Sequence, residues 1–482
     1  MKVLTKRKKI IGNTIILIIS SLIIKALGLL NRIFLTRSLG NTGISLYALI
    51  MPTIMLFISL SSLSLNTAMI KVSSKYKTKK VIVSGISIAI ITSSITSILL
   101  LLSLKTISIT LLKQIDTYYP ILCSIPLLYF TSISSVIRGY FTGIEKMQIT
   151  SFANIIEQLS RILFTILLFL IFKNQSTLFY VVISILVMSI GELSSLLFTI
   201  INLKKIKHKN IEINKIKIKK ELLDIAVPST VSSIISNITF FLEPIIFTFV
   251  LTKQNFLPED ILYKYSEVTA YAIPMITLFS FVSGSISMAV MPKLSVSCDN
   301  AISSFLSTII TLTIIPSLFI SLILHNYSDE LCLLLFKTKI GSNLVKKYIY
   351  FFIVFYFISP FSTVLLSTGK SKLLFVYSTI VHVIKILSLF VLPLFTNDSL
   401  ILSYLLSHVL LFVLLFSFLI KKYHFKIQFN NLFLIILIFV ITVLSKIVID
   451  SFITSFFIKI ILLTIIYLLL CTIFIFKNRN NI

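Results

Sequence analysis

The chain has 482 residues, of which 57% are hydrophobic and only 12% are charged, and it contains no Trp. Lys and Arg number 44 against 16 Asp and Glu, so the formal net charge is +28. A soluble protein carries roughly a quarter charged residues, a disordered one has low hydrophobicity, and four Cys are too few for a disulfide scaffold. The composition therefore predicts a multi-pass membrane protein whose charges lie in its loops, and it argues against nucleic acid as a partner.

Apolar runs of about 20 residues, each long enough to cross the hydrocarbon core as a helix, follow one another along the chain. They cover residues 11–36, 44–70, 82–104, 119–141, 149–172, 177–203, 222–250, 268–291, 301–324, 348–367, 373–395, 399–420, 431–449 and 453–476. The first run is too long for a signal peptide and carries Lys25, so we expect it to be a span. The pattern predicts an all-α membrane protein with about 14 transmembrane helices.

The loop charges predict the orientation of these spans. With the N-terminus inside, the inside segments hold 28 basic residues, the outside segments hold 10, and six lie within spans. This bias follows the positive-inside rule, so both termini are expected to be cytoplasmic. The count places Arg138 and Lys146 together in an inside loop.

The densest basic run lies between the sixth and seventh spans and begins Lys204-Lys205-Ile206-Lys207-His208-Lys209. Its composition is typical of a solvated linker that binds anionic lipid head groups. We therefore expect four parts, namely an N-terminal six-helix lobe (1–203), a basic cytoplasmic linker (204–221), a C-terminal six-helix lobe (222–420), and two extra transmembrane helices with a basic tail (421–482). Residues 68–73 and 289–295 are similar and hold equivalent places in the two lobes, which favours parallel repeats.

Several ionisable side chains fall inside the predicted spans. They are Lys25, Arg32, Glu157, Arg161, Glu192, Glu243, His382, Lys385, Lys446 and Lys459. A charged side chain at the centre of a span costs roughly 2.5–3.5 kcal/mol on insertion scales. Most of these groups must therefore face a polar interior or one another, whereas Lys446 and Lys459 lie near span ends and are expected to snorkel.

Two cations share one face of the first span, because Lys25 and Arg32 are two helical turns apart. Gly28 lies between them and permits close approach of a neighbouring helix. The span contains no acidic residue, so this pair favours an anionic ligand in a cavity. The alternative is pairing with Glu157, Glu192 or Glu243 of other spans.

Acidic residues in later spans have local partners that suggest coupling or gating. Glu157 and Arg161 are four residues apart, which allows an ion pair that is either structural or part of a gate. Glu243 precedes Pro244, which frees a backbone carbonyl and is able to break a helix. A carboxylate beside a broken helix is a candidate site for Na⁺ or a proton. His382, one turn from Lys385, is expected to be a packing residue.

Signatures of catalysis are absent from the sequence. It has no CxxC pair, no GxxxxGK[ST] phosphate loop and no long outer loop for an external catalytic domain. We therefore expect no enzyme activity, no catalytic residue, no metal site and no bound cofactor.

The opening Lys25-Ala-Leu-Gly-Leu-Leu-Asn-Arg32 and the later Arg138-Gly139-Tyr140, Glu157-Gln158 and Arg161 resemble the family of stage V sporulation protein B. That family belongs to the polysaccharide-transport branch of the multidrug/oligosaccharidyl-lipid/polysaccharide exporter superfamily. Lys370 and Lys385 match its second half more loosely, and the resemblance runs from about residue 10 to 395. Thr142 departs from the family pattern, which usually has Gln there.

The resemblance implies a flippase in the bacterial cell membrane, with two lobes around a central cavity and a lipid-tail groove formed by the last two helices. Its implied substrate is an undecaprenyl-pyrophosphate-linked saccharide, such as lipid II or a polysaccharide repeat unit, moved by alternating access for peptidoglycan, polysaccharide or spore cortex synthesis. Lys25, Arg32, Arg161 and Lys385 are the candidate ligands of the pyrophosphate, because cations form charge-assisted hydrogen bonds with it. Glu157, Glu192 and Glu243 are the candidate coupling or gating residues.

Coupling to Na⁺ or H⁺ is left open, and we expect a monomer that contacts membrane lipid, with cell-wall synthases as candidate partners. A cation-coupled multidrug exporter of the same superfamily is the main competing hypothesis, although it predicts an acid-lined cavity. A membrane sugar-lipid polymerase or ligase and a scaffold for cell-wall assembly are two further hypotheses.

Overall fold

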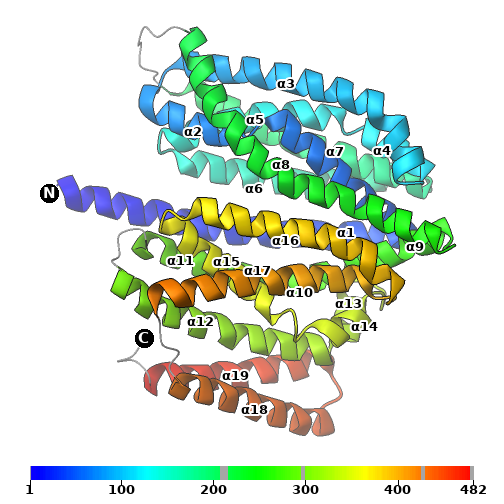
Figure 1. Ribbon diagram of the computed structural model, residues 1–482, viewed down its shortest axis with the longest axis vertical. Helices are drawn as coiled ribbons and strands as arrows, with labels where there is room; N and C mark the ends of the chain where they lie inside the picture. Colours follow the sequence, from blue (N-terminus) through cyan, green and yellow to red (C-terminus); the bar gives the residue numbers. More distant parts are fainter. Residues whose placement is uncertain (1, 207–214, 295–298, 425–428, 478–482) are drawn as a thin grey trace. The chain divides into compact units, whose positions relative to one another are not determined.

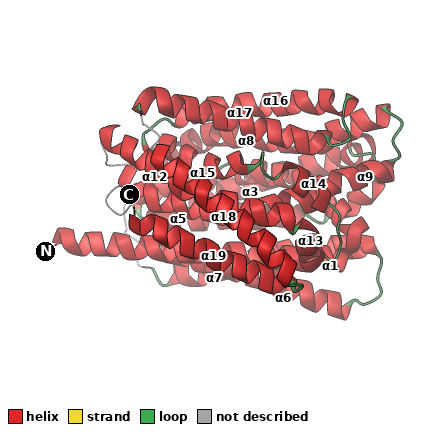
Figure 2. Cartoon of the chain, turned by 90° about the horizontal axis from the view of Figure 1, so that it is seen from below, coloured by secondary structure: helices red, strands yellow, loops and turns green. Residues whose placement is uncertain are grey.

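The computed structural model describes residues 2–206, 215–294, 299–424 and 429–477. Within these ranges the chain is helical and has no β-strand, as Figure 2 shows. The prediction of an all-α protein is therefore confirmed. Lys207, His208 and Lys209 of the basic linker lie outside the described residues.

The chain divides into two compact units. Unit 1 comprises Met1–Ser266 and Ile386–Phe395, and unit 2 comprises Glu267–Lys385 and Thr396–Ile482. The four-part division expected from the linker stays a prediction.

Unit 1 begins with α1 (Lys2–Ser62), which contains the first predicted span and most of the second. Gly40 interrupts this helix with φ 65° and ψ −173°, a conformation that is nearly restricted to glycine. α1 is therefore kinked at Gly40 (Figure 1).

The remaining helices of unit 1 form a bundle. They are α2 (Leu65–Tyr76), α3 (Lys79–Lys105), the π-helix η1 (Thr106–Leu111), η2 (Ile115–Thr117), α4 (Tyr118–Leu122), α5 (Ile125–Gly143), α6 (Met147–Ile171), α7 (Thr177–Lys204), α8 (Lys215–Lys253), α9 (Pro258–Ser266) and the short η4 (Leu392–Leu394). A Cβ atom at Gly139 would lie 2.7 Å from the Asn66 carbonyl oxygen, and one at Gly143 would lie 2.6 Å from the Ile70 carbonyl oxygen. These two glycines, four residues apart, thus allow α5 to pack closely on α2.

Unit 2 is built from a second set of helices. They are η3 (Glu267–Ala272), α10 (Ile273–Thr277), α11 (Ser280–Leu294), α12 (Asp299–Asn326), α13 (Ser328–Phe336), α14 (Ser342–Tyr348), α15 (Ile353–Ser367), most of α16 (Ser371–Val391), α17 (Ser399–Tyr423), α18 (Phe429–Phe452) and α19 (Phe456–Lys477). Phe357 and Phe361 of α15 pack against Phe412 of α17, with ring centroids 5.7 and 5.8 Å apart. Aromatic packing thus joins the middle helices of this unit.

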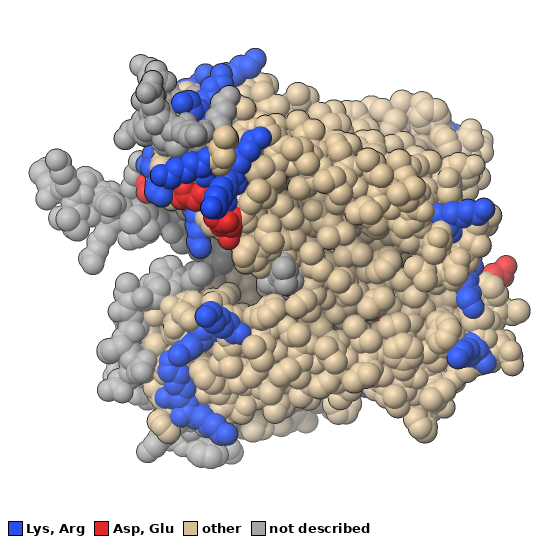
Figure 3. Space-filling model, turned by 45° about the horizontal axis from the view of Figure 1, so that its top comes forward, with Lys and Arg blue, Asp and Glu red and all other residues tan. Residues whose placement is uncertain are grey.

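Within the described ranges, nine helices are long and apolar enough to cross a membrane, or 12 if each of three bent pairs counts as one span. The range Leu22–Tyr76 is counted as one span, although most of two predicted spans lie in it, on either side of Gly40. On the face that Figure 3 shows, Lys and Arg gather at two opposite ends, with a broad uncharged surface between them. The chain is therefore a multi-pass membrane protein, whereas the count of 14 stays a prediction.

The loops of unit 1 alternate between its two ends. One pocket is lined by residues from four segments near the ends that the charge count assigns to the outside, namely Asn41, Gln114, Thr177 and Glu259. At the other end, the Lys75 Nζ lies 3.0 Å from a carboxylate oxygen of Glu221, which joins two segments assigned to the inside. The alternation of loops agrees with the charge count, and the cytoplasmic location of the termini stays a prediction.

Candidate functional site

Four charged side chains from α5, α6 and α7 meet inside unit 1, and we refer to Arg138, Glu157, Arg161 and Glu192 as the charge cluster. Nη2 of Arg138 lies 2.8 Å from Oε2 of Glu157 and 2.9 Å from Oε1 of Glu192. Nη2 of Arg161 lies 2.6 Å from Oε1 of Glu157. Two positive and two negative groups compensate one another, which offsets the cost of keeping them out of water.

The expected pairing of Glu157 with Arg161 is confirmed, because one turn of α6 separates them. The partners on the other helices depend on close packing. A Cβ atom at Gly191 of α7 would lie 2.5 Å from Cγ of Arg161 and 3.0 Å from the Glu157 carbonyl oxygen. Gly191 thus makes room for Arg161 and brings the adjacent Glu192 to the cluster.

Arg138 does not lie in an inside loop, where the charge count places it. It lies within α5, and its side chain is only 17% exposed. It also donates a hydrogen bond of 2.7 Å to Oγ of Ser195 on α7. Its position inside the apolar run 119–141 was the available signal, because that run already included it.

Arg32 and Arg161, two of the candidate pyrophosphate ligands, lie in the same region of unit 1. α1 lies close to α6 at Gly28, where a Cβ atom would be 3.8 Å from the Gln158 side chain. Lys25 and Arg32 are exposed, whereas the Arg161 side chain is only 18% exposed.

Lys385 of unit 2 is buried, and its Nζ lies 3.5 Å from the centre of the Tyr404 ring. This geometry is a cation–π interaction between α16 and α17. His408, one turn after Tyr404, places its Nδ1 2.6 Å from the Tyr404 carbonyl oxygen. A role for Lys385 in holding an anion stays a prediction.

Glu243 is fully buried in α8, where the Tyr265 hydroxyl donates a hydrogen bond of 3.2 Å to its Oε1. The expectation of a helix broken at Pro244 is wrong, because α8 continues from Lys215 to Lys253 through that residue. The imide nitrogen still removes one backbone hydrogen bond. The argument from a broken helix for cation or proton binding at Glu243 is therefore lost, and such binding stays a prediction.

Lys446 and Lys459, which are expected to snorkel, share one acidic partner, and their snorkelling stays a prediction. Both ammonium groups lie 3.0 Å from carboxylate oxygens of Asp450. The Tyr327 hydroxyl donates a third hydrogen bond, of 3.1 Å, to the same carboxylate. Asp450 thus ties α18 and α19 to the end of α12, and the two lysines have a structural role.

Comparison with known proteins identifies relatives by sequence. Residues 10–319 match the family described as "Polysaccharide biosynthesis protein". Stage V sporulation protein B of Bacillus subtilis (strain 168) is 27% identical over 412 residues, which cover 82% of this chain and 79% of that protein.

Solved structures share the fold at lower sequence identity. The lipid II flippase MurJ in an inward closed conformation has a TM-score of 0.73 at 17% identity, covering 95% of this chain and 98% of that one. The MATE multidrug transporter DinF-BH has a TM-score of 0.59 at 15% identity, covering 87% of this chain and 97% of that one. Both similarities concern the fold alone.

Proposed function

Because the chain belongs to the polysaccharide biosynthesis protein family, we propose that it is a flippase that moves a saccharide linked to a lipid pyrophosphate across the membrane. In a bacterium, the membrane that the saccharide crosses would be the cell membrane. Its similarity to stage V sporulation protein B and the fold it shares with a lipid II flippase support this proposal. An undecaprenyl-linked lipid II or polysaccharide repeat unit is the proposed substrate.

The observation that carries the proposal is that α1, which carries Lys25 and Arg32, lies close at Gly28 to α6, which carries Arg161, within the apolar helices of unit 1. A pyrophosphate is a multivalent anion whose oxygens accept paired hydrogen bonds from guanidinium groups. Glu157 holds Arg161, and Arg138 pairs with both Glu157 and Glu192. The charge cluster would thus set the position of Arg161 before substrate arrives, while exposed Lys25 extends the basic face of α1.

Movement of the substrate would follow an alternating-access cycle of a monomer with 14 helices and cytoplasmic termini. The charge cluster is the proposed gate, because exchange of ion-pair partners among Arg138, Arg161 and the two glutamates would shift α5, α6 and α7 against one another. Glu243 is the proposed group for coupling to Na⁺ or H⁺, and cell-wall synthases would use the product. The protein would act as a transporter and not as an enzyme.

The test uses proteoliposomes that contain a fluorescent lipid-linked saccharide, whose exposure to an external quencher is followed over time. The double variant Lys25→Ala/Arg32→Ala should lose translocation at unchanged protein abundance. Lys105→Ala/Lys173→Ala is the matched control, because it also removes two exposed cations. Wild-type vesicles that translocate no faster than empty ones would defeat the flippase, and full activity of the first double variant would remove Lys25 and Arg32 as ligands.

A cation-coupled multidrug exporter is the second candidate, since a MATE transporter shares the fold. It would move a cationic dye in response to an imposed Na⁺ or H⁺ gradient in the same vesicles. Dye transport without translocation of lipid-linked saccharide would favour this candidate over the flippase.

A further inference from the structure

A polar pocket of about 520 Å³ opens at one end of unit 1. It is formed by the start of the second segment of α1, the chain around η2, the beginning of α7 and the exposed face of α9. Its volume lies within the range of roughly 300–1,000 Å³ that is usual for small-molecule sites. The charge count assigns all four segments to the outside, so this pocket lies at the end of the membrane path opposite Lys75 and Glu221.

The lining of this pocket combines acceptors with neutral donors. Asp116, Glu259 and Asp260 supply carboxylates, and Asn41 and Gln114 supply amide groups. Threonine and serine hydroxyls complete the polar surface, and none of the residues that line this pocket is Lys or Arg. Carboxylates accept hydrogen bonds from several hydroxyls at once, and they repel anions. The pocket therefore suits a neutral, hydroxyl-rich ligand and disfavours a phosphate.

A tyrosine adds an amphipathic surface to this polar pocket. Tyr263 of α9 lines it and is 47% exposed. Its ring offers an apolar face beside the carboxylates, and its hydroxyl both donates and accepts hydrogen bonds. A sugar ring, with apolar C–H faces and a polar edge, matches this combination.

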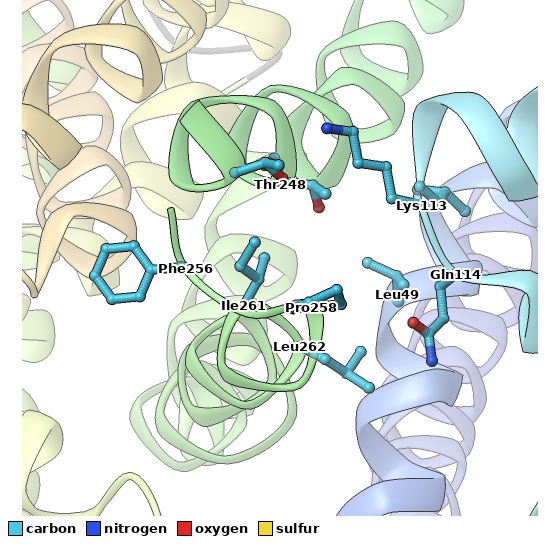
Figure 4. A pocket seen from close by; sticks show the side chains of 10 residues that line it. Leu49, Lys113, Gln114, Thr248, Phe256, Pro258, Ile261 and Leu262 are labelled. Atoms are coloured by element: carbon cyan, nitrogen blue, oxygen red, sulfur yellow. The ribbon is translucent and has the colours of Figure 1, made fainter. Parts of the chain in front are cut away.

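A smaller apolar pocket adjoins the polar one, and Gln114 and Leu262 line both. Its volume is about 70 Å³, and its walls include Leu49 and Ile261 (Figure 4). Lys113 also lines it, but its side chain points toward α8 and away from Gln114 (Figure 4). A space of this size, about two water molecules in bulk volume, admits a small apolar substituent such as the methyl of an acetamido group.

Metal binding explains the carboxylates less well. No group of three His, Cys, Asp or Glu side chains with a geometry suited to a metal ion occurs in the described ranges. A ligand with several hydroxyls uses the amides and hydroxyls of this lining as well as its carboxylates.

We propose that the two adjoining pockets form a second ligand site, which binds a neutral saccharide with an acetamido substituent. Its role as a receiving site for the sugar end of the translocated substrate rests on the proposed function, but saccharide binding itself does not. The basic residues Arg32 and Arg161 would hold the pyrophosphate, and the acidic pocket would accept only the sugar. This separation by charge would orient the substrate within unit 1.

The absence of Trp from the chain allows a direct test with the full-length protein in detergent. Tyr263→Trp introduces a sole tryptophan into the pocket, and its emission is followed during titration with N-acetylglucosamine. We expect a saturable shift, with glucose binding more weakly and inorganic pyrophosphate causing none. Adding Glu259→Gln/Asp260→Asn should weaken binding by at least about tenfold, because hydrogen bonds to charged groups are lost. Adding Asp224→Asn is the matched control, since Asp224 is an exposed acid on α8 outside the pocket.

Calorimetric titration of the wild-type chain with N-acetylglucosamine gives the second measurement, in case the tryptophan itself disturbs the site. No binding in either experiment would overturn the proposal, even if vesicles translocate lipid-linked saccharide normally. An equal emission shift with pyrophosphate, Na⁺ or Ca²⁺ would also overturn it. Saccharide binding that depends on Glu259 and Asp260 would support the site, even if translocation itself were absent and the proposed function failed.

Discussion

Arg161 of α6 lies over Gly191 of α7, so the absent side chain of the glycine provides the space that the arginine occupies. A Cβ atom at Gly191 would be 2.5 Å from Cγ of Arg161. This contact links the packing of two helices to the position of a proposed pyrophosphate ligand. An uncharged residue therefore helps to set the position of a charged one in the cluster.

Gly191→Ala should displace Arg161 and lower translocation, because neither the carbonyl of Glu157 nor the Arg161 stem can move freely. Overpacking of this kind costs typically about 1–3 kcal/mol. Thermal unfolding in detergent and the vesicle assay measure the two effects. Gly28→Ala is the control, since its nearest neighbour would be 3.8 Å away. Equal stability of the two variants would contradict the packing argument.

Arg138→Gln should be strongly destabilising, because Glu157 and Glu192 would lose their shared partner in a buried site. Breaking a buried ion pair by removing one partner costs roughly 3–5 kcal/mol. The double variant Arg138→Gln/Glu192→Gln removes one charge of each sign and should recover part of that loss. Thermal unfolding of the two single variants and the double variant gives the coupling energy. A double variant no more stable than Arg138→Gln would argue against this pairing.

Asp450→Asn should loosen the attachment of α18 and α19, since Lys446, Lys459 and Tyr327 all lose a charged acceptor. We expect faster limited proteolysis of the last two helices and a lower unfolding temperature. Asp224→Asn is the control, because Asp224 is an exposed acid on α8, far along the chain from these helices. Indistinguishable proteolysis of the two variants would refute a special role for Asp450.

The contact between Glu221 and α2 should depend on pH. Burial opposes ionisation of this carboxyl, but hydrogen bonds from Lys75 and Tyr76 outweigh it and lower the pKa of Glu221. A lowered folded-state pKa stabilises the protein above the ordinary Glu value of about 4.3, and this contribution is lost as the pH falls through the lowered pKa. Unfolding temperatures at pH 7 and at a pH well below the ordinary Glu value measure the loss.

Glu221→Gln should slightly reduce the difference between the unfolding temperatures measured at the two pH values. The effect is small because the contact is partly exposed. Glu145→Gln, at an exposed carboxylate of the same unit, provides the comparison. An unchanged difference in Glu221→Gln would mean that other groups cause the pH dependence.

The sequence by itself determined those features that depend on composition or on neighbours along one helix. Apolar runs identified the helices, because the bilayer requires continuous apolar stretches whose backbone groups bond internally. The pair Glu157–Arg161 was predictable, since four residues make one turn. Charge bias assigned the loops to alternating ends, and this assignment agrees with the four segments that meet at the polar pocket of unit 1.

Only the tertiary structure decided which partners distant residues have. Arg138 meets Glu192 from 54 positions away, and Asp450 meets Tyr327 from 123 positions away. Such contacts depend on how closely helices pack, which glycines such as Gly191 permit without any charge pattern to reveal it. The sequence therefore indicated that buried charges need partners, because burial without them is too costly. The folded chain determined that Arg138 and Asp450 supply them.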